Sequence, residues 1–374
     1  MVKKTVGGIV VGRREQRPMP PGVVTVACRG KGRLGCGRFW GPPTGRFTMI
    51  SRRITLGLLF AIALPLLGSS VIARKANKKK SDKVTRFVRY DDDGDVSYGI
   101  LEGKKITRID GDLFGKWKKT GKTVDLDDVK LLVPSRPTQV FAMAGNYKSH
   151  LGDQDKTTTK ITTVTTITQD NKTGATETAS ETSSEIRKSG VIPPKFQIPQ
   201  PFYKTISCLL PHGGTIILPK DAKMVHYEAE LVIVIGKTAK NVSKKDALKY
   251  VLGVTCGNDV SAREWQRNDV QWWRAKASDT FGPCGPVIAS GLDYSNLQLT
   301  LRLNGEVKQD ENTKYFINDV PSMVSFLSRH VTLHPGDLIF TGTPGKTSEL
   351  KSGDVVEVEL SGVGVLRNKV AAEK

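Results

Sequence analysis

The chain has 374 residues, and its 57 Lys and Arg against 37 Asp and Glu give a formal net charge of +20. Residues 1–80 hold 17 of the basic residues and a single acid, Glu15, so the rest of the chain carries 40 basic and 36 acidic residues. A nucleic-acid-binding protein is expected to carry its basic patch on the folded domain, and this distribution therefore argues against that class. The five cysteines show no spacing typical of a metal site or a disulfide framework.

The first 81 residues are predicted to form a leader in three parts. Residues 1–48 are rich in Gly, Pro and Arg without an apolar period, which is typical of a disordered tail; alternatively they are not translated. Met49 to Ala73 has the basic, apolar and small-residue regions of a signal peptide, and its apolar run is too short for a stable membrane span. Residues 74–81 follow as a basic spacer. We expect export to the periplasm or outside the cell if this segment is cleaved, and a cytoplasmic protein otherwise.

The body divides into a small and a large unit. Residues 82–132 alternate loosely between apolar and polar positions, interrupted by Asp-Gly and Glu-Gly turns, which predicts a small β-rich unit. Residues 133–374 are expected to form one large domain. It contains a Thr/Ser-rich insertion at 154–190, where the sequence at 170–174 is compatible with a hairpin turn between β-prone arms. The low hydrophobicity of the insertion equally favours disorder.

Local signals predict three further elements of the large domain. Ser243 with Asp246 three residues later is typical of a helix start, and we expect that helix to run as far as Gly253. The Asn304-Gly305 pair predicts a hairpin turn. Residues 320–330 have the spacing of an amphipathic helix.

Two acidic residues lie inside an apolar segment. Val225 to Ile235 is rich in Val, Ile and Leu and predicts a strand, on which Glu228 and Glu230 share one face. A solvated sheet face is the simplest interpretation of such a pair alone, but buried carboxylates need a cationic partner or a metal. Asp259 supplies a third carboxylate just past the next predicted strand, and oxygen donors suit a hard ion such as Mg²⁺, Mn²⁺ or Ca²⁺. Lys276 would balance the charge or bind a substrate oxygen.

Four motifs in this order resemble the fumarylacetoacetate hydrolase family: HYEAEL from His226, GNDVSAREWQ from Gly257, RAKASDTFGPCGP from Arg274 and GDLIFTGTP from Gly336. The resemblance implies an α+β, β-rich fold, a mixed β-sandwich roll preceded here by the small N-terminal unit, and usually a homodimer. It implies that Glu228, Glu230 and Asp259 bind one divalent metal ion. The Phe-Tyr-Lys sequence at 202–204 also matches and is expected to form a strand at the pocket wall.

The resemblance assigns water activation to a mobile lid. His150 matches the histidine of an Asn-Tyr-x-x-His motif, and Asp153 stands where the family usually has Glu, so the expected dyad is one methylene shorter. A surface-loop histidine without a catalytic role is the alternative for His150. Lys276 and Gln266 would stabilise the negative charge that develops in the reaction.

Four more residues are assigned to the substrate by the resemblance. These are Tyr147 in the histidine motif, Arg263 facing the substrate carboxylate, and Thr341 and Thr343 in the Gly-Thr-Pro loop. The alternative for Arg263 is an ion pair with Asp259 or Glu264, and the two roles can coexist.

The implied reaction is hydrolytic cleavage of a C–C bond in a small β-diketo acid, an acylpyruvate or a fumarylacetoacetate-like compound, through a metal-bound enolate. Hydratases, isomerases, decarboxylases and lyases of related 2-oxo acids are alternatives, and the position of His150 and Asp153 relative to the metal discriminates between them. A second alternative is a non-catalytic oxoacid-binding protein. The expected partner is a small oxoacid, with no nucleic acid.

Overall fold

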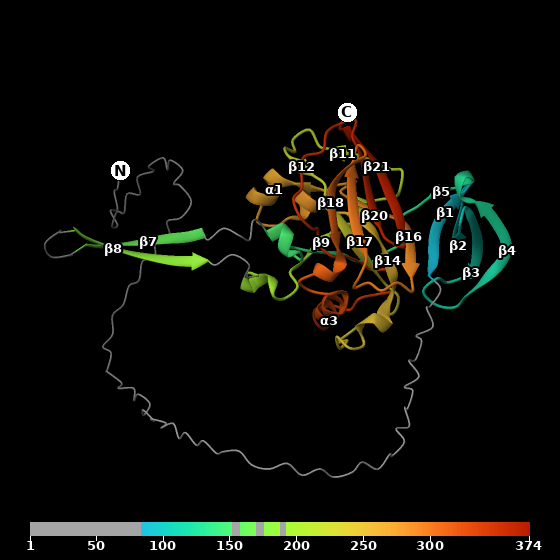
Figure 1. The fold of residues 1–374 in the computed structure, drawn as a ribbon, viewed down its shortest axis with the longest axis horizontal. Coiled ribbons are helices and arrows are strands. Elements are labelled where there is room, and N and C mark those ends of the chain that lie inside the picture. The colour runs from blue at the N-terminus through green and yellow to red at the C-terminus, as the bar shows by residue number, and fades with distance from the viewer. Residues whose placement is uncertain (1–83, 152–157, 170–175, 188–191) are drawn as a thin grey trace, which may run out of the picture. The chain divides into compact units, whose positions relative to one another are not determined.

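The computed structural model describes residues 84–151, 158–169, 176–187 and 192–374. The predicted tail, signal peptide and spacer, and also Asp153, lie outside these ranges. Strands dominate and helices are short (Figure 1), which confirms the β-rich α+β fold class. Within the described ranges, every helix is too short or too polar to cross a bilayer.

The N-terminal strands belong to the same sheet as the large domain. Strand β1 pairs antiparallel with β16, with Thr85 opposite Ser290, and β2, β3 and β4 follow outward in order. The small β-rich unit therefore extends the main sheet and does not build a separate one. Its elements are β1 (Thr85–Asp92), β2 (Asp95–Glu102), β3 (Lys105–Gly111), β4 (Trp117–Asp125), η1 (Leu126–Asp128) and β5 (Lys130–Leu131).

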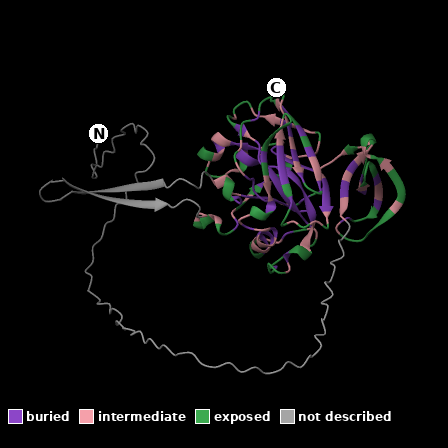
Figure 2. Cartoon of the chain, viewed as in Figure 1, coloured by how far each residue is buried: buried purple, intermediate pink, exposed green. Residues whose placement is uncertain are grey.

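The main sheet has twelve strands. Ten of them follow the order β4-β3-β2-β1-β16-β14-β13-β19-β6-β9, while β10 pairs with β16 and β5 pairs with β1. Its inner strands are buried on both faces (Figure 2). On β13, Leu231 and Ile233 belong to one core cluster, whereas Val232 and Val234 belong to the other. The strands of the large domain in this sheet are β6 (Val140–Met143), β9 (Pro201–Lys204), β10 (Leu209–Leu210), β13 (Ala229–Ile235), β14 (Val251–Asn258), β16 (Gly282–Ser290) and β19 (Leu338–Phe340).

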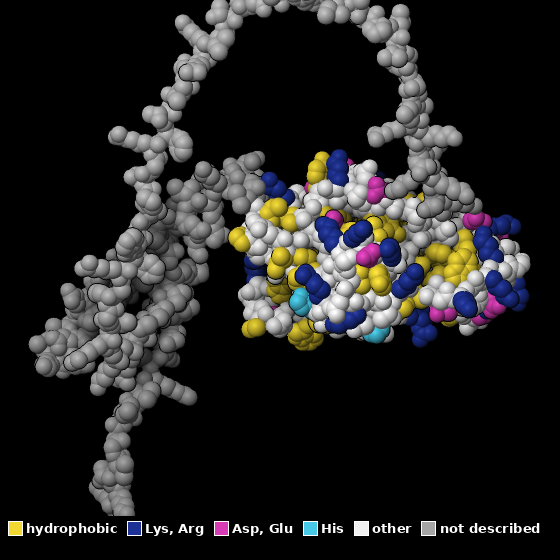
Figure 3. All heavy atoms as spheres, turned by 90° about the horizontal axis from the view of Figure 1, so that it is seen from below, with side chains coloured by type: hydrophobic (Ala, Val, Ile, Leu, Met, Phe, Trp, Pro, Cys, Tyr) yellow, Lys and Arg dark blue, Asp and Glu magenta, His cyan; other side chains and the backbone are white. Residues whose placement is uncertain are grey.

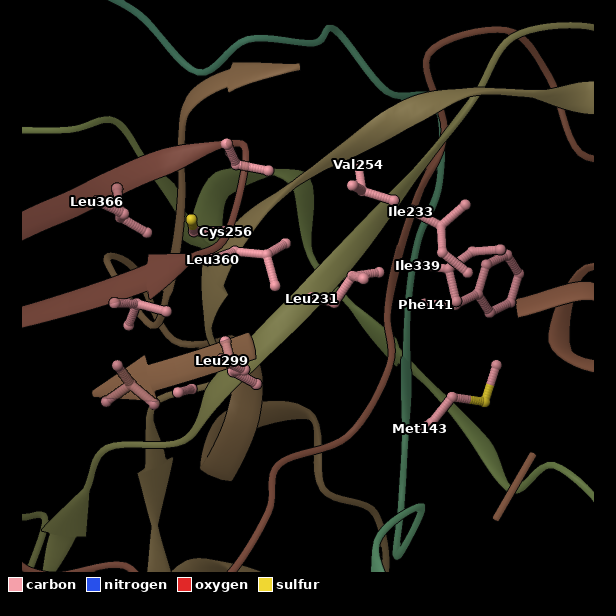
Figure 4. Close-up of a cluster of buried hydrophobic side chains, with 14 of the residues drawn as sticks. Phe141, Met143, Leu231, Ile233, Val254, Cys256, Leu299, Ile339, Leu360 and Leu366 are labelled. Atoms are coloured by element: carbon pink, nitrogen blue, oxygen red, sulfur yellow. The ribbon is translucent and has the colours of Figure 1, made fainter. Parts of the chain in front are cut away.

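A second sheet of five strands, ordered β11-β21-β20-β17-β18, packs against the main sheet through side chains of one core cluster. Figure 4 shows Leu231 of β13 in this cluster with Leu299 of β17 and Leu360 of β20. Full burial of such a side chain contributes about 1.5–3 kcal/mol. The strands are β11 (Thr215–Leu218), β17 (Gln298–Leu303), β18 (Glu306–Asn312), β20 (Val355–Leu360) and β21 (Gly364–Ala372).

Several local predictions are confirmed. Asn304 and Gly305 connect β17 and β18, and both adopt positive φ, as this turn requires. Residues 320–330 form the longest α-helix described. The helices are α1 (Arg263–Asn268), α2 (Trp273–Ala277) and α3 (Val320–His330), with the 3-10 turns η2 (Lys148–Leu151), η3 (Pro194–Phe196), η4 (Ile206–Cys208), η5 (Ala247–Tyr250) and η6 (Thr313–Tyr315).

Two local predictions are wrong. The helix expected after Ser243 is only the turn η5, because β14 begins at Val251 and its pairing with β13 leaves no room for a longer helix. The strand expected from Val225 to Ile235 is interrupted at residues 227–228. Its first part, β12 (Val225–His226), pairs instead with β15 (Ser261–Ala262).

The Thr-rich insertion contains two strands, β7 (Thr158–Gln169) and β8 (Thr176–Arg187), which pair with each other as the hairpin interpretation predicts. The predicted turn at 170–174 lies outside the described residues.

Charged side chains are interspersed on the face seen in Figure 3. Lys and Arg lie there in separate groups, with acidic side chains between some of them. This mixture agrees with the near balance of basic and acidic residues beyond the leader.

Candidate metal centre and active site

Antiparallel pairing brings the three predicted acids together. Ala229 lies opposite Asn258 and Glu230 opposite Gly257, so Asp259, one residue beyond β14, lies beside Glu228. The Asp259 amide donates to the Glu228 carbonyl at 2.8 Å. Gly257 is needed for this close pairing because a Cβ there would clash with Val232 and Phe340.

The three carboxylates form a buried cluster. One ligand oxygen each of Glu228, Glu230 and Asp259 lies within 4.8 Å of the other two, and each residue is at most 3% exposed. This convergence is the geometry that a metal site requires, and it rules out the solvated sheet face for these acids.

Glu228 is held by cations. Lys276 Nζ lies 2.5 Å from Glu228 Oε2 and 2.8 Å from Asp259 Oδ2, and Arg263 Nη2 lies 2.6 Å from Glu228 Oε1. Burial alone would raise the pKa of Glu228, but Lys276 and Arg263 outweigh it and hold the pKa below its ordinary value. Glu228 is therefore an ionised ligand candidate at neutral pH.

Glu230 has an oxygen without a partner. Its Oε2 accepts a hydrogen bond from the Gly342 amide at 2.7 Å, while its buried Oε1 has no hydrogen-bond partner in the described structure. Burial, reinforced by the neighbouring Asp259 and Glu228, raises the pKa of Glu230 well above its ordinary value. An unpaired carboxylate oxygen aimed into an all-oxygen cluster fits a hard divalent cation, which would satisfy Oε1 and relieve the repulsion.

A second lysine, assigned only a place in the pocket wall from the sequence, anchors the cluster. Lys204 on β9 is buried, and its Nζ donates to Asp259 Oδ1 at 2.7 Å and to the carbonyls of Phe281, at 3.2 Å, and Lys276. Burial lowers the pKa of Lys204, but Asp259 more than compensates and the net pKa is raised. The available signal was a lysine at the end of the apolar Pro-Phe-Tyr segment, because a buried lysine needs an acidic partner.

His150 on η2 faces the cluster with one ring nitrogen. Its Nδ1 lies 2.8 Å from the Gly345 carbonyl oxygen, and its Nε2 lies 3.7 Å from Glu228 Oε1. A carbonyl oxygen only accepts, so Nδ1 carries the proton, and in the neutral ring Nε2 has a free lone pair. The surface-loop alternative is therefore disfavoured.

A cavity of about 160 Å³ opens beside the cluster. The predicted residues His150, Gln266, Lys276 and Thr343 line it together with Glu228. Gln309, which the sequence did not indicate, orients Thr343 by donating to its Oγ1 at 2.9 Å. This volume lies below the range of about 300–1,000 Å³ usual for drug-sized ligands, which indicates a small substrate.

Three predicted substrate contacts are not among the cavity-lining residues. Tyr147 is fully buried, and its hydroxyl has no hydrogen-bond partner within the described ranges. The Thr341 hydroxyl donates to the Leu231 carbonyl at 2.8 Å, which ties two strands together. Arg263 forms an ion pair, as its alternative interpretation expected, but the partner is Glu228 and not Asp259 or Glu264. Its Nη2 also donates to Thr347 Oγ1 at 2.7 Å.

Comparisons with known proteins find relatives over most of the described chain. The family model described as fumarylacetoacetate (FAA) hydrolase C-terminal matches residues 139–371, and the model described as Rv2993c-like, N-terminal matches residues 85–134. An uncharacterised protein of Methanocaldococcus jannaschii is 38% identical over 272 residues, 73% of this chain and 97% of that protein. The mitochondrial oxaloacetate tautomerase FAHD2A of Bos taurus is 41% identical over 181 residues, 45% of this chain and 58% of that protein.

Solved structures share the fold. The crystal structure of 2-hydroxyhepta-2,4-diene-1,7-dioate isomerase from Mycobacterium marinum superposes with a TM-score of 0.63 at 33% identity, covering 77% of this chain and 99% of that one.

Proposed function

Because the chain belongs to the fumarylacetoacetate hydrolase family, we propose that it is a divalent-metal-dependent enzyme that moves a proton at the carbon beside the oxo group of a 2-oxo acid. This is a keto–enol tautomerisation or a related isomerisation. Its relatives include proteins named as a tautomerase and an isomerase. The metal ligands would be Glu228, Glu230 and Asp259, and their oxygen donors favour Mg²⁺ or Mn²⁺ over softer ions.

The tautomer of His150 carries this proposal. Its Nδ1–H is held by the Gly345 carbonyl, so Nε2 is the nitrogen that can accept a proton, and it points to the cluster. Since Nδ1 is already bonded to a carbonyl, a carboxylate such as Asp153 is not needed to fix the ring. A single oriented base next to a carbonyl-binding site is sufficient for proton abstraction at carbon.

The remaining cavity residues would stabilise the charge that develops on the oxo oxygen. The bound ion would supply Lewis-acid polarisation of the 2-oxo group. Lys276, which bridges Glu228 and Asp259, adds a fixed positive charge at the same place. Gln266 and Thr343 offer polar groups from the cavity wall.

Hydrolytic cleavage of a β-diketo acid is the second candidate. The His150 side chain is 24% exposed, so water can reach Nε2, and the same base could activate that water. The two reactions differ in what loses the proton, a carbon or a water molecule.

The test is exchange of the C3 protons of 2-oxo acids with deuterium, followed by NMR on the full chain loaded with Mg²⁺ or Mn²⁺. The proposal predicts metal-dependent exchange without chain cleavage. Cleavage of acetylpyruvate without faster exchange would favour hydrolysis, and ligand binding without either reaction would favour a non-catalytic oxoacid-binding protein.

Two further features are part of this proposal. We infer a homodimer, which sedimentation would test, and export with cleavage after Ala73, which N-terminal sequencing of the native protein would test. A monomer, or a mature chain that begins near Met1, would contradict them.

A further inference from the structure

The cavity beside the acidic cluster is lined by two chemically different kinds of side chain. Its polar groups, described above, belong to the metal end. The other lining side chains are apolar and include Met143, Leu151, Phe196, Phe202 and Trp272. A substrate whose oxo-acid end lies at the cluster would therefore place its remote end against hydrocarbon and aromatic surface.

Phe196 is fixed in this apolar wall by its backbone and by a glycine. Asn318 Nδ2 donates to the Phe196 carbonyl at 3.1 Å. The Phe196 ring packs directly over Gly145, where a Cβ would clash with it. Gly145 also has a φ of +64°, a conformation that favours glycine.

Two further aromatic side chains line the cavity. The rings of Phe202 and Trp272 meet edge to face, with their centroids 5.4 Å apart. Lys276 Nζ lies 5.5 Å from the centroid of the Phe202 ring. The same Nζ donates hydrogen bonds to Glu228 and Asp259, so Phe202 lies beside the polar end of the cavity.

The Lys and Arg side chains in and near the cavity already contact acidic, polar or aromatic groups of the protein. Lys276 is the sole Lys or Arg among the described residues that line the cavity, and its ammonium bridges two acids of the cluster. Arg263 is held by Glu228, Gln266 and Thr347. Lys195 lies over the Phe196 ring, 4.8 Å from its centroid, and does not line the cavity.

We propose that the natural substrate is a 2-oxo acid whose remote end is uncharged and apolar, held by apolar lining side chains away from Lys276 such as Phe196. A second carboxylate at that end would lose its hydration against these side chains and gain no cationic partner there. This inference rests on the proposed function, since it assumes that the oxo-acid group lies at the metal end.

The test compares two 2-oxo acids of the same length, 2-oxoglutarate and 5-methyl-2-oxohexanoate, in which an isopropyl group replaces the remote carboxylate. Metal-dependent C3 deuterium exchange is measured with the full chain, and each kcat/KM is divided by the uncatalysed rate. We expect the apolar acid to be preferred by about tenfold or more. An equal or better rate with 2-oxoglutarate overturns the inference but leaves the proposed function intact. Exchange with neither acid refutes the proposed function, and the inference with it.

A pair of variants locates the preference. Phe196→Arg places a cation in the apolar wall and is expected to shift the ratio toward 2-oxoglutarate by about tenfold or more, chiefly through KM. Phe196→Leu keeps the wall apolar and should keep the wild-type preference. If Phe196→Arg folds and leaves the ratio unchanged, Phe196 does not contact the remote end. If it does not fold, the wild-type ratio alone decides the inference.

Discussion

Two parts of the site are built in different ways: the acidic cluster with its lysines, called the floor here, and His150, called the rim. In the floor, Glu228 and Asp259 are buried and held by the side chains of Lys204 and Lys276. In the rim, His150 sits on a 3-10 turn, is partly exposed and is held by a backbone carbonyl. Under the proposed function these two parts would divide the work, since the floor would bind the ion and the rim would move the proton. Changes in the floor should therefore affect metal binding or stability, whereas changes in the rim should affect kcat.

Removal of the metal is expected to have the largest effect. Chelation should reduce exchange to the background rate, because the floor without its ion leaves the 2-oxo group unpolarised. Circular dichroism should show the fold unchanged, and added Mn²⁺ should restore the rate. Full activity in excess chelator would contradict the proposed role of the floor, because catalysis would then not depend on a bound metal ion.

His150→Ala should lower kcat by about 10²–10⁴-fold, since it removes the proposed base. The Mn²⁺ affinity should stay close to the wild-type value, because no predicted ligand is changed. His330→Ala is the matched control, since His330 is exposed at the end of α3 and should leave both quantities unchanged. If His150→Ala lost metal affinity instead, the floor and the rim would not be separate.

Lys204→Met should destabilise the fold by about 3–5 kcal/mol, because it leaves the Asp259 charge buried without this partner. The matched control is Lys249→Met. Lys249 pairs with Asp246 at 2.7 Å, the same distance as in the buried pair, but on the surface. Urea unfolding should show little change for that exposed pair. Similar results for the two variants would mean that burial does not set the strength of the Lys204 pair.

The smallest effect is expected at the link between floor and rim. Asn146 Nδ2 donates to the carbonyls of Thr341 and Asn318, at 2.7 and 3.1 Å, and its Oδ1 accepts from the Asn318 amide at 2.8 Å. Asn146→Ala should cost about 1–3 kcal/mol, because buried backbone groups lose their partner. Thermal unfolding would measure this, and a loss as large as that of Lys204→Met would reverse the expected order.

The floor was more predictable from the sequence than the rim. Strand parity predicted Glu228 and Glu230 on one face. The strand is interrupted at residues 227–228, but both acids still join the cluster, and the register of β13 with β14 brings Asp259 beside Glu228. Lys204 was missed because its partner is 55 residues away. The bond between His150 and Gly345 spans 195 residues and uses a backbone carbonyl, which no side-chain pattern reveals.

Tertiary pairing also overrode local signals. The helix-start pattern at Ser243 did form a local contact, since the Asp246 amide donates to Ser243 Oγ at 3.2 Å. The helix nevertheless ended after one turn, because β14 gains more from pairing with two neighbouring strands. The Ser243–Asp246 contact therefore forms, but neither the start nor the length of the element was predicted correctly, since η5 begins at Ala247.

The most direct test of the account is Mn²⁺ titration of the wild-type protein and of Glu230→Gln by calorimetry. The variant preserves the shape of a side chain whose pKa burial already raises, so stability without metal should change little. We predict that wild-type protein binds Mn²⁺ and gains about 2.7 kcal/mol of stability at a hundredfold excess over Kd, whereas Glu230→Gln loses both. Equal Mn²⁺ affinity in the two proteins would contradict the claim that these carboxylates form the metal centre.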